Sequence, residues 1–197
     1  MTERQELAPL ISALADLTKW FESANVPGIV VGGVAASLIG RPRLTHDVDA
    51  LVMVDEAHWH ELLEQGIPFG FRPRLTDALA FAARSRVLLM RHEPSGVDVD
   101  IMFGALRFEE EAVAHRTFVT VAGVVLPLPT PEDLIVMKAV AHRPRDLTDI
   151  EAILDAHPDL DVDHVRRWVR EFARAAAMPE IWDDLRRLLK DREERRD

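Results

Sequence analysis

The sequence predicts an α/β fold of the α+β type, with a mixed sheet flanked by helices and a helical C-terminal region. Segments typical of strands occur only before Pro129, and from Thr130 onward every segment has helical spacing. A chain of 197 residues is long enough to bury its own core without disulfides. We therefore expect an α/β domain at residues 1–129 and a helical region at residues 130–197.

The elements of the first domain follow from local patterns in chain order. Residues 6–24 repeat apolar side chains every three or four positions and end before Pro27-Gly28, which predicts a helix. Further helices are expected at 34–39, 56–65, 76–84 and 108–115. β-Branched runs and alternating segments predict strands at 29–31, 46–54, 86–91 and 97–103, and a hairpin of 117–121 with 124–128.

The helical region begins with a strong start signal. Thr130 is a suitable N-cap, Pro131 suits the first helical position, and Glu132 and Asp133 place acidic groups in the first turn. The four expected helices are 131–142, 146–156, 163–177 and 179–195.

Composition excludes several classes of protein. The chain has no cysteine, which excludes a thiolate zinc site and a cysteine nucleophile. Its net charge of −10 argues against non-specific binding to duplex DNA, which depends on neutralising phosphates. No apolar run approaches the ~18 residues that a membrane span requires, and residues 1–10 lack the pattern of a signal peptide. A cytoplasmic protein is expected.

A glycine pair follows the first expected strand, at Gly32-Gly33. Glycines at this place let the backbone approach a bulky anionic group closely. The helix that follows directs its first N–H groups toward the same group. The pair therefore indicates a binding site for an anion.

Two Asp-x-Asp motifs lie on expected strands. Asp47 and Asp49 project from one face of a strand, about 6.7 Å apart at Cα. Two carboxylates this close repel each other unless a divalent cation lies between them, and Mg²⁺ suits such oxygen ligands. Asp98 and Asp100 repeat the pattern opposite an apolar strand face. A solvent-exposed sheet face is the alternative explanation.

These motifs together resemble the polymerase-β-like nucleotidyltransferase superfamily, and within it the AbiEii-type branch, which includes toxins of toxin–antitoxin pairs. The resemblance covers residues 30–154. Besides the glycine pair, it rests on three stretches: the R-x-T-x-D-x-D pattern at 43–49, Asp-Ile-Met-Phe at 100–103 followed by Phe-Glu-Glu at 108–110, and the EDLI-x-x-K…R-P-x-D-x-x-D block at 132–149.

The resemblance implies a nucleotidyltransferase fold in which Asp47, Asp49 and Asp100 hold Mg²⁺ and Gly32 and Gly33 face the triphosphate of an NTP. Asp100 is preferred over Asp98 because the residues after it continue as in the family. The implied reaction moves a nucleoside monophosphate from an NTP to a hydroxyl acceptor and releases pyrophosphate.

Lys138 is the one charged side chain on an otherwise apolar stretch of its expected helix, so it either extends to water or reaches an anion. The family block favours phosphate binding. Asp146 either caps the helix that it begins or has an active-site role, such as orienting Lys138 or the acceptor. Arg41, Arg43 and Arg143 are candidate phosphate contacts or, alternatively, solvated surface cations.

The sequence leaves three functions in competition. The leading one is a Mg²⁺-dependent nucleotidyltransferase of the toxin-like branch that acts on an RNA end or a protein hydroxyl and has a cognate antitoxin as a possible partner. A small-molecule nucleotidyltransferase of the aminoglycoside-modifying kind is the second. The third is a non-catalytic relative that binds a nucleotide or a partner. A basic stripe in the helical region is the best candidate strip for RNA, and consists of Arg166, Arg167, Arg170 and Arg174.

Overall fold

The computed structural model describes residues 3–196 and divides into two compact units. Unit 1 contains the chain up to Val34 together with Leu44–Pro129. Unit 2 contains Ala35–Arg43 and the chain from Thr130 onward. The domain boundary after Pro129 stays a prediction.

Unit 1 is built on a five-stranded sheet, and its mixed pairing confirms the mixed sheet that the sequence predicts. Its strand order is β1-β2-β5-β4-β3. Strands β2 and β5 pair in parallel, and the other neighbours pair antiparallel. The strands are β1 (Gly28–Val31), β2 (Asp47–Val52), β3 (Phe71–Pro73), β4 (Val87–His92) and β5 (Val97–Phe103). Strand β3 was not predicted, because three residues are too few to show a period.

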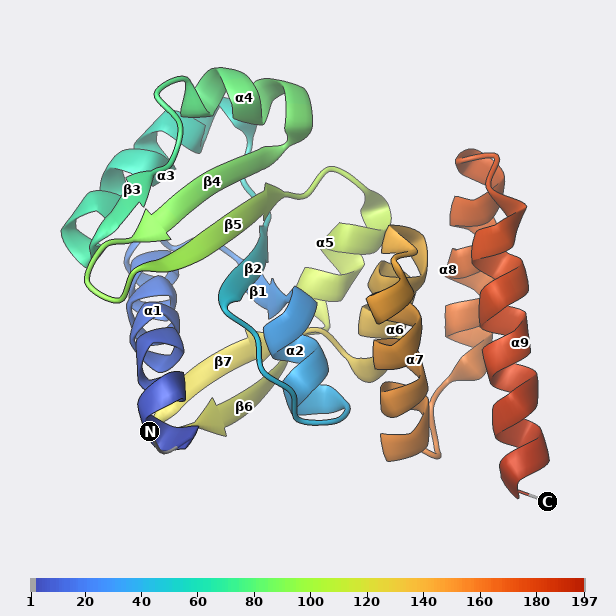
Figure 1. Cartoon of the computed structure of the whole chain (residues 1–197). Coiled ribbons are helices and arrows are strands. Elements are labelled where there is room, and N and C mark those ends of the chain that lie inside the picture. Colours follow the sequence, from blue (N-terminus) through green and yellow to red (C-terminus); the bar gives the residue numbers. More distant parts are fainter. Residues whose placement is uncertain (1–2, 197) are drawn as a thin grey trace. The chain divides into compact units, whose positions relative to one another are not determined.

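Helices cover one face of this sheet (Figure 1). The ring of Trp20, on α1, packs on the ring of Phe71 with 5.0 Å between centroids. A Cβ added to Gly66, on α3, would lie 2.6 Å from the same indole, so the glycine permits close packing. The helices of unit 1 are α1 (Glu3–Ser23), α3 (Trp59–Gly66), α4 (Ala78–Ser85) and α5 (Arg107–Ala114), with short 3₁₀ turns at Glu56–His58 and Ile67–Phe69.

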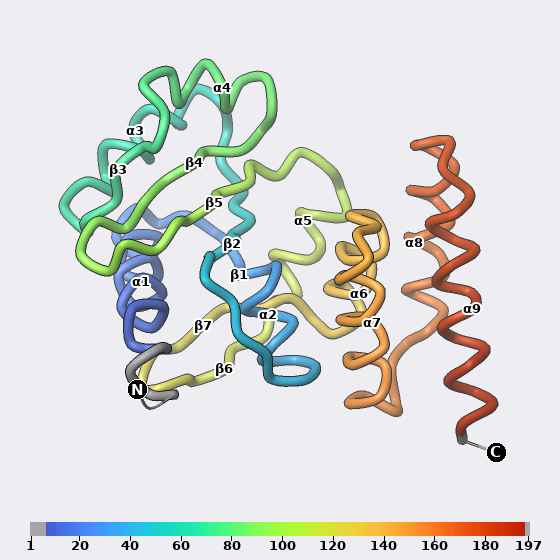
Figure 2. The backbone as a smooth tube through the Cα atoms, in the orientation of Figure 1, coloured from blue at the N-terminus to red at the C-terminus, as the bar shows by residue number. Residues whose placement is uncertain are grey.

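The predicted hairpin forms with the predicted bounds. Strands β6 (Thr117–Val121) and β7 (Val124–Leu128) make a separate two-stranded sheet, and β7 contacts β1 and α1. The turn places Ala122 and Gly123 at φ values of 49° and 83°. Figure 2 shows the backbone reversing at this turn.

Unit 2 is helical. The helix α2 (Gly32–Ile39) starts at the glycine pair. From Ala35 onward its residues belong to unit 2, together with the segment that follows up to Arg43. The Thr130 hydroxyl accepts the Asp133 N–H at 3.1 Å, which confirms the predicted N-cap. Buried side chains such as Leu134, Ile150 and Leu185 form the core. The other helices are α6 (Pro131–Ala141), α7 (Pro144–Ala156), α8 (Val162–Ala175) and α9 (Pro179–Arg196).

Each helix within residues 3–196 is too short or too polar to cross a lipid bilayer.

Candidate functional site

The parallel pairing of β2 with β5 brings the two Asp-x-Asp motifs together. Asp47 lies opposite Asp98, and Asp49 lies opposite Asp100. Their neighbours Val48 and Val99 are fully buried, so the four carboxylates lie on the other, open face of the sheet. This arrangement agrees with both interpretations of the motifs, a divalent-cation site and a solvent-exposed sheet face.

Gly32 allows the backbone to pass directly beside one of these carboxylates. Its φ is +60°, in the left-handed region that favours glycine. A Cβ at this position would lie 1.8 Å from Oδ2 of Asp49. Gly33 follows in the first turn of α2. Gly32 therefore permits the backbone to lie close to Asp49.

Thr45 positions the other carboxylate of β2. Its hydroxyl donates to Oδ1 of Asp47 at 2.7 Å. This contact gives the threonine of the R-x-T-x-D-x-D pattern a physical role, because it fixes the rotamer of the first aspartate.

Two arginines on the same face were not predicted as site residues. Arg91, on β4, pairs with Oδ1 of Asp98 at 2.7 Å. Arg74 follows β3, pairs with Oδ2 of Asp98 at 3.1 Å and also binds Asp100. The sequence holds one weak signal for them, the Arg72-Pro73-Arg74 alternation in an extended segment.

The environment of Asp100 shifts its titration. Burial raises the pKa of Asp100 above its ordinary value. The Arg74 guanidinium lowers this pKa, the charges of Asp47 and Asp98 raise it, and the net direction is upward. Asp100 thus holds a proton more readily than an ordinary aspartate.

The donor set of this face fits Mg²⁺ by its chemistry. Carboxylate oxygens from two neighbouring strands are the ligands that a hard divalent cation prefers. In the part of the chain that the structure describes, no three acidic or histidine side chains converge closely enough for a metal site. Arg74 holds Asp98 and Asp100 in this conformation. Binding of a cation therefore requires Asp100 to exchange its partner.

A second cluster, in unit 2, surrounds Lys138. Its Nζ donates to Oδ1 of Asp146 at 2.8 Å and lies 2.8 Å from Oδ2 of Asp149. All three side chains are buried. Asp146 also accepts the Arg143 N–H at 3.2 Å, so it caps α7 and contacts Lys138 at the same time. The anion that Lys138 reaches in the structure is a pair of carboxylates.

Arg43 completes this cluster. Its Nε and Nη2 donate to the two oxygens of Asp149, each at 2.9 Å. Asp149 was not predicted as a site residue, although it is the last aspartate of the R-P-x-D-x-x-D block. The remaining candidate cations, Arg41 and Arg143, have side chains that are not buried.

The pKa of Asp149 is shifted in the opposite direction from the pKa of Asp100. Burial raises the pKa of Asp149. The hydrogen bonds from Arg43 and Lys138, together with their positive charges, lower the pKa by more than burial raises it. The net shift is downward from the ordinary value of 3.8. Asp149 is therefore held as a carboxylate.

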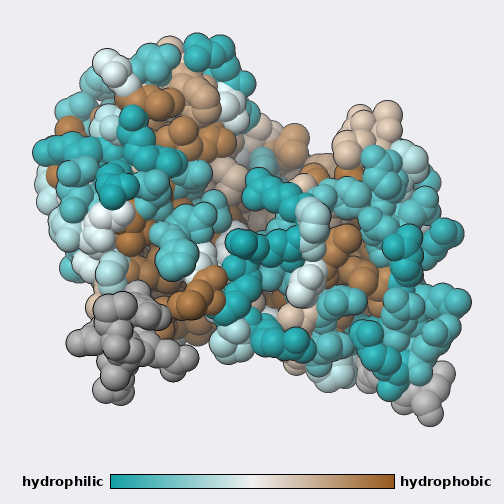
Figure 3. Space-filling model, viewed as in Figure 1, coloured by the Kyte–Doolittle hydropathy of each residue, from teal (hydrophilic) through white to brown (hydrophobic). Residues whose placement is uncertain are grey.

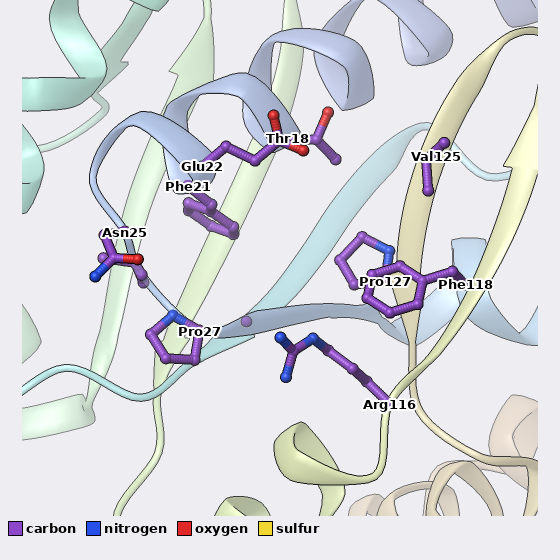
Figure 4. A pocket seen from close by; sticks show the side chains of 11 residues that line it. Thr18, Phe21, Glu22, Asn25, Pro27, Arg116, Phe118, Val125 and Pro127 are labelled. Carbon is purple, nitrogen blue, oxygen red and sulfur yellow. The ribbon is translucent and has the colours of Figure 1, made fainter.

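A groove of about 360 Å³ lies apart from the predicted residues of unit 1. It is lined by α1 and the β6–β7 hairpin, with Phe21, Phe118 and Pro127 among its side chains (Figure 4). The Arg116 guanidinium lies 5.7 Å from the Phe118 ring. None of the predicted site residues lines this groove.

Comparisons with known proteins agree with the fold. The family model described as "Nucleotidyl transferase AbiEii toxin, Type IV TA system" matches residues 25–197. No curated protein is similar to the sequence at a significant level.

Solved structures with the same fold share little sequence. An antigenic nucleotidyltransferase-like protein from Paracoccidioides brasiliensis is 19% identical, with 92% of this chain and 93% of that one covered and a TM-score of 0.52. The antibiotic-resistance factor ANT(2'')-Ia is 17% identical, with 91% and 97% covered and a TM-score of 0.56. The lincosamide antibiotic adenylyltransferase LnuA is 17% identical, with 79% and 98% covered and a TM-score of 0.50.

Gly32→Ala should destabilise the fold more than Gly123→Ala. Both glycines have a positive φ, but a Cβ at Gly123 has no neighbour within 4 Å, whereas one at Gly32 collides with Asp49. Gly123→Ala should cost about 1–2 kcal/mol, the strain of a left-handed residue. Unfolding in urea measures both losses, and equal losses would contradict the close approach at Asp49.

Lys138→Met should lower the free energy of unfolding by about 3–5 kcal/mol, because it leaves two buried carboxylates without their shared cation. Adding Asp146→Asn should recover part of the loss, since one of those charges is removed. The matched control is Lys190→Met, on an exposed lysine of α9, which should change stability by less than about 0.5 kcal/mol. Urea unfolding of the four proteins checks this, and a stable Lys138→Met variant would refute it.

The pKa of Asp149 should rise in Arg43→Gln, because the variant loses the bidentate partner that lowers it. A folded-state pKa below that of the unfolded chain means that ionised Asp149 stabilises the fold above about pH 3.8 and loses this effect as the pH falls through the lowered value. Carboxyl ¹³C NMR titration measures the pKa in both proteins. An unchanged pKa would assign the shift to Lys138 alone.

Proposed function

The chain belongs to the AbiEii nucleotidyltransferase family, and on this premise we propose that it moves a nucleoside monophosphate from an NTP to a hydroxyl acceptor with the help of Mg²⁺. The acceptor is an RNA end or a protein, and the family implies a cognate antitoxin as partner. The observation that carries the proposal is the in-register set of four carboxylates beside the Gly32 turn.

In this proposal Asp47, Asp49 and Asp100 hold the cation, and Gly32 and Gly33 face the triphosphate. When bound, Mg²⁺ polarises the α-phosphoryl group and neutralises charge on the phosphates. The acceptor oxygen forms a bond to the α-phosphorus, the bond from that phosphorus to the bridging oxygen breaks, and pyrophosphate leaves. A carboxylate of the same set accepts the proton of the attacking hydroxyl.

Lys138 retains a proposed role as a phosphate ligand. An ammonium group has three donors, and two of them face Asp146 and Asp149. One donor is therefore left for an anion. Asp146 and Asp149 orient the lysine for that contact, and Arg43 in turn orients Asp149.

The alternative acceptor is a small molecule. A structure of ANT(2'')-Ia is a complex with adenylyl-2''-tobramycin. The acidic composition of this chain, with a net charge of −10, suits a cationic acceptor in general terms.

Binding of an NTP should require a divalent cation, and Asp49→Asn should remove transfer while the fold persists. Asparagine keeps the shape of the side chain but relieves like-charge repulsion, so the melting temperature should be equal or higher. Isothermal titration with NTP, in Mg²⁺ and in EDTA, measures the first effect. Equal affinity in EDTA would refute the cation site.

The matched control for that experiment is Asp98→Asn, which changes a carboxylate held by two arginines on the neighbouring strand of the same face. It should retain most of the cation-dependent NTP binding. If Asp98→Asn loses binding as Asp49→Asn does while Asp100→Asn retains it, Asp98 rather than Asp100 is the third carboxylate.

A further inference from the structure

The open face of the sheet carries opposite charges on its two halves. Arg72 on β3 lies opposite Arg91 on β4, Arg91 lies opposite Asp98 on β5, and Asp98 lies opposite Asp47 on β2. Cross-strand partners project from the same face. One row of four strands therefore reads arginine, arginine, aspartate, aspartate.

Arg74 extends the cationic half into the next row. Its N–H donates to the carbonyl of Leu89 at 2.9 Å, and Leu89 lies opposite Asp100. The Arg91 side chain is 47% exposed and that of Arg74 is 28% exposed, so solvent reaches both guanidinium groups. In Figure 3, hydrophilic side chains gather over the region of β4 and β5.

Like charges directly opposite each other destabilise a sheet. The Asp47–Asp98 pair belongs to the carboxylate set, where a bound cation would relieve the repulsion. In the Arg72–Arg91 pair the two like charges are positive, so an anion would relieve the repulsion. The Arg72 side chain is exposed and makes no ion pair or hydrogen bond with the side chains described between residues 7 and 195. An anion bound between Arg72 and Arg91 would relieve their repulsion, and the planar guanidinium fork matches the geometry of phosphate.

The order of the strands separates this pair from the expected triphosphate. The Gly32 turn follows β1, on one side of β2 and β5, and the arginines lie on β4 and β3, on the other side. An NTP phosphate at the Gly32 turn and an anion at the arginines would thus lie on opposite sides of the carboxylates. An anion at the arginines would then come from the acceptor and not from the NTP.

We propose that Arg72 and Arg91, with Arg74 beside them, bind a backbone phosphate of a single-stranded RNA acceptor whose terminal hydroxyl reaches the carboxylates. This inference rests on the proposed nucleotidyl transfer and selects among its acceptors. An aminoglycoside would place ammonium groups beside guanidinium groups, and this repulsion discriminates against it.

The test measures binding of RNA without NTP. A single-stranded RNA of ten nucleotides, labelled at its 5′ end and with a free 3′ hydroxyl, is titrated with the full chain by fluorescence anisotropy at several salt concentrations. Arg72→Gln should weaken binding roughly tenfold, the loss expected for a hydrogen bond to a charged group. The slope of log K against log salt should fall by about 0.7, the value for one phosphate contact on a single strand.

One exposed arginine supplies a matched control, and a second one tests the competing RNA site on the basic stripe. Arg107, on α5, is 83% exposed and pairs with Glu111. Arg170, on α8, stacks on the Trp182 ring at 4.2 Å and belongs to the basic stripe. Arg107→Gln and Arg170→Gln should leave RNA affinity within about twofold. A loss at Arg170 with none at Arg72 would move the RNA site to α8 and overturn the proposal.

Two further arms separate this inference from the proposed function. If Arg72→Gln weakens binding of NTP with Mg²⁺ but not of RNA, the arginines serve the triphosphate and the acceptor assignment is wrong. If the wild type binds tobramycin but not RNA, the acceptor is a small cation and the assignment is also wrong. If the wild type binds RNA through Arg72 but does not bind NTP, the RNA phosphate site is supported and the proposed nucleotidyl transfer is refuted.

Discussion

The register of the parallel pair β2–β5 is the constraint on which the candidate site depends. A shift of one residue would turn Asp98 and Asp100 toward the buried face and move Val97 and Val99 into water. Burying unpaired carboxylates costs several kcal/mol each, so the apolar alternation of β5 fixes the register. The positions of the four carboxylates are a consequence of core packing.

The buried cluster around Lys138 is a different kind of constraint. Ion pairs in a protein interior contribute little net stability, because the cost of desolvating each charge offsets the attraction between them. They do specify geometry, since any arrangement that separates Lys138 from Asp146 and Asp149 leaves buried charges unpaired. Arg43 extends this specification to the segment Ala35–Arg43. The lysine block of the sequence thus also determines how unit 2 packs.

Local patterns predicted the parts of the site that depend on local structure. The alternation of β5, the glycine pair before α2 and the Thr130 cap were all readable, because each is a property of a few consecutive residues. Strand β3 was not readable, because three residues show no period. The Arg43–Asp149 contact joins residues 106 positions apart, and no local pattern encodes such a pair. The arginines of the open face were missed for the same reason, since only the register places them beside the aspartates.

The charge row on the open face explains how an acidic chain could hold a polyanion. Net charge governs long-range attraction, but a bound phosphate responds mainly to charges within a Debye length, about 8 Å at physiological salt. Arg72 and Asp47 are three strand spacings apart, about 14 Å. Between them, one guanidinium nitrogen of Arg91 pairs with Asp98, which places a positive charge between the phosphate and the carboxylates. A phosphate at Arg72 is therefore attracted by Arg72 and screened from Asp47. A cation at Asp47 is likewise attracted by Asp47 and screened from Arg72. The same sheet can hold both charges of one reaction because its strands keep them this far apart.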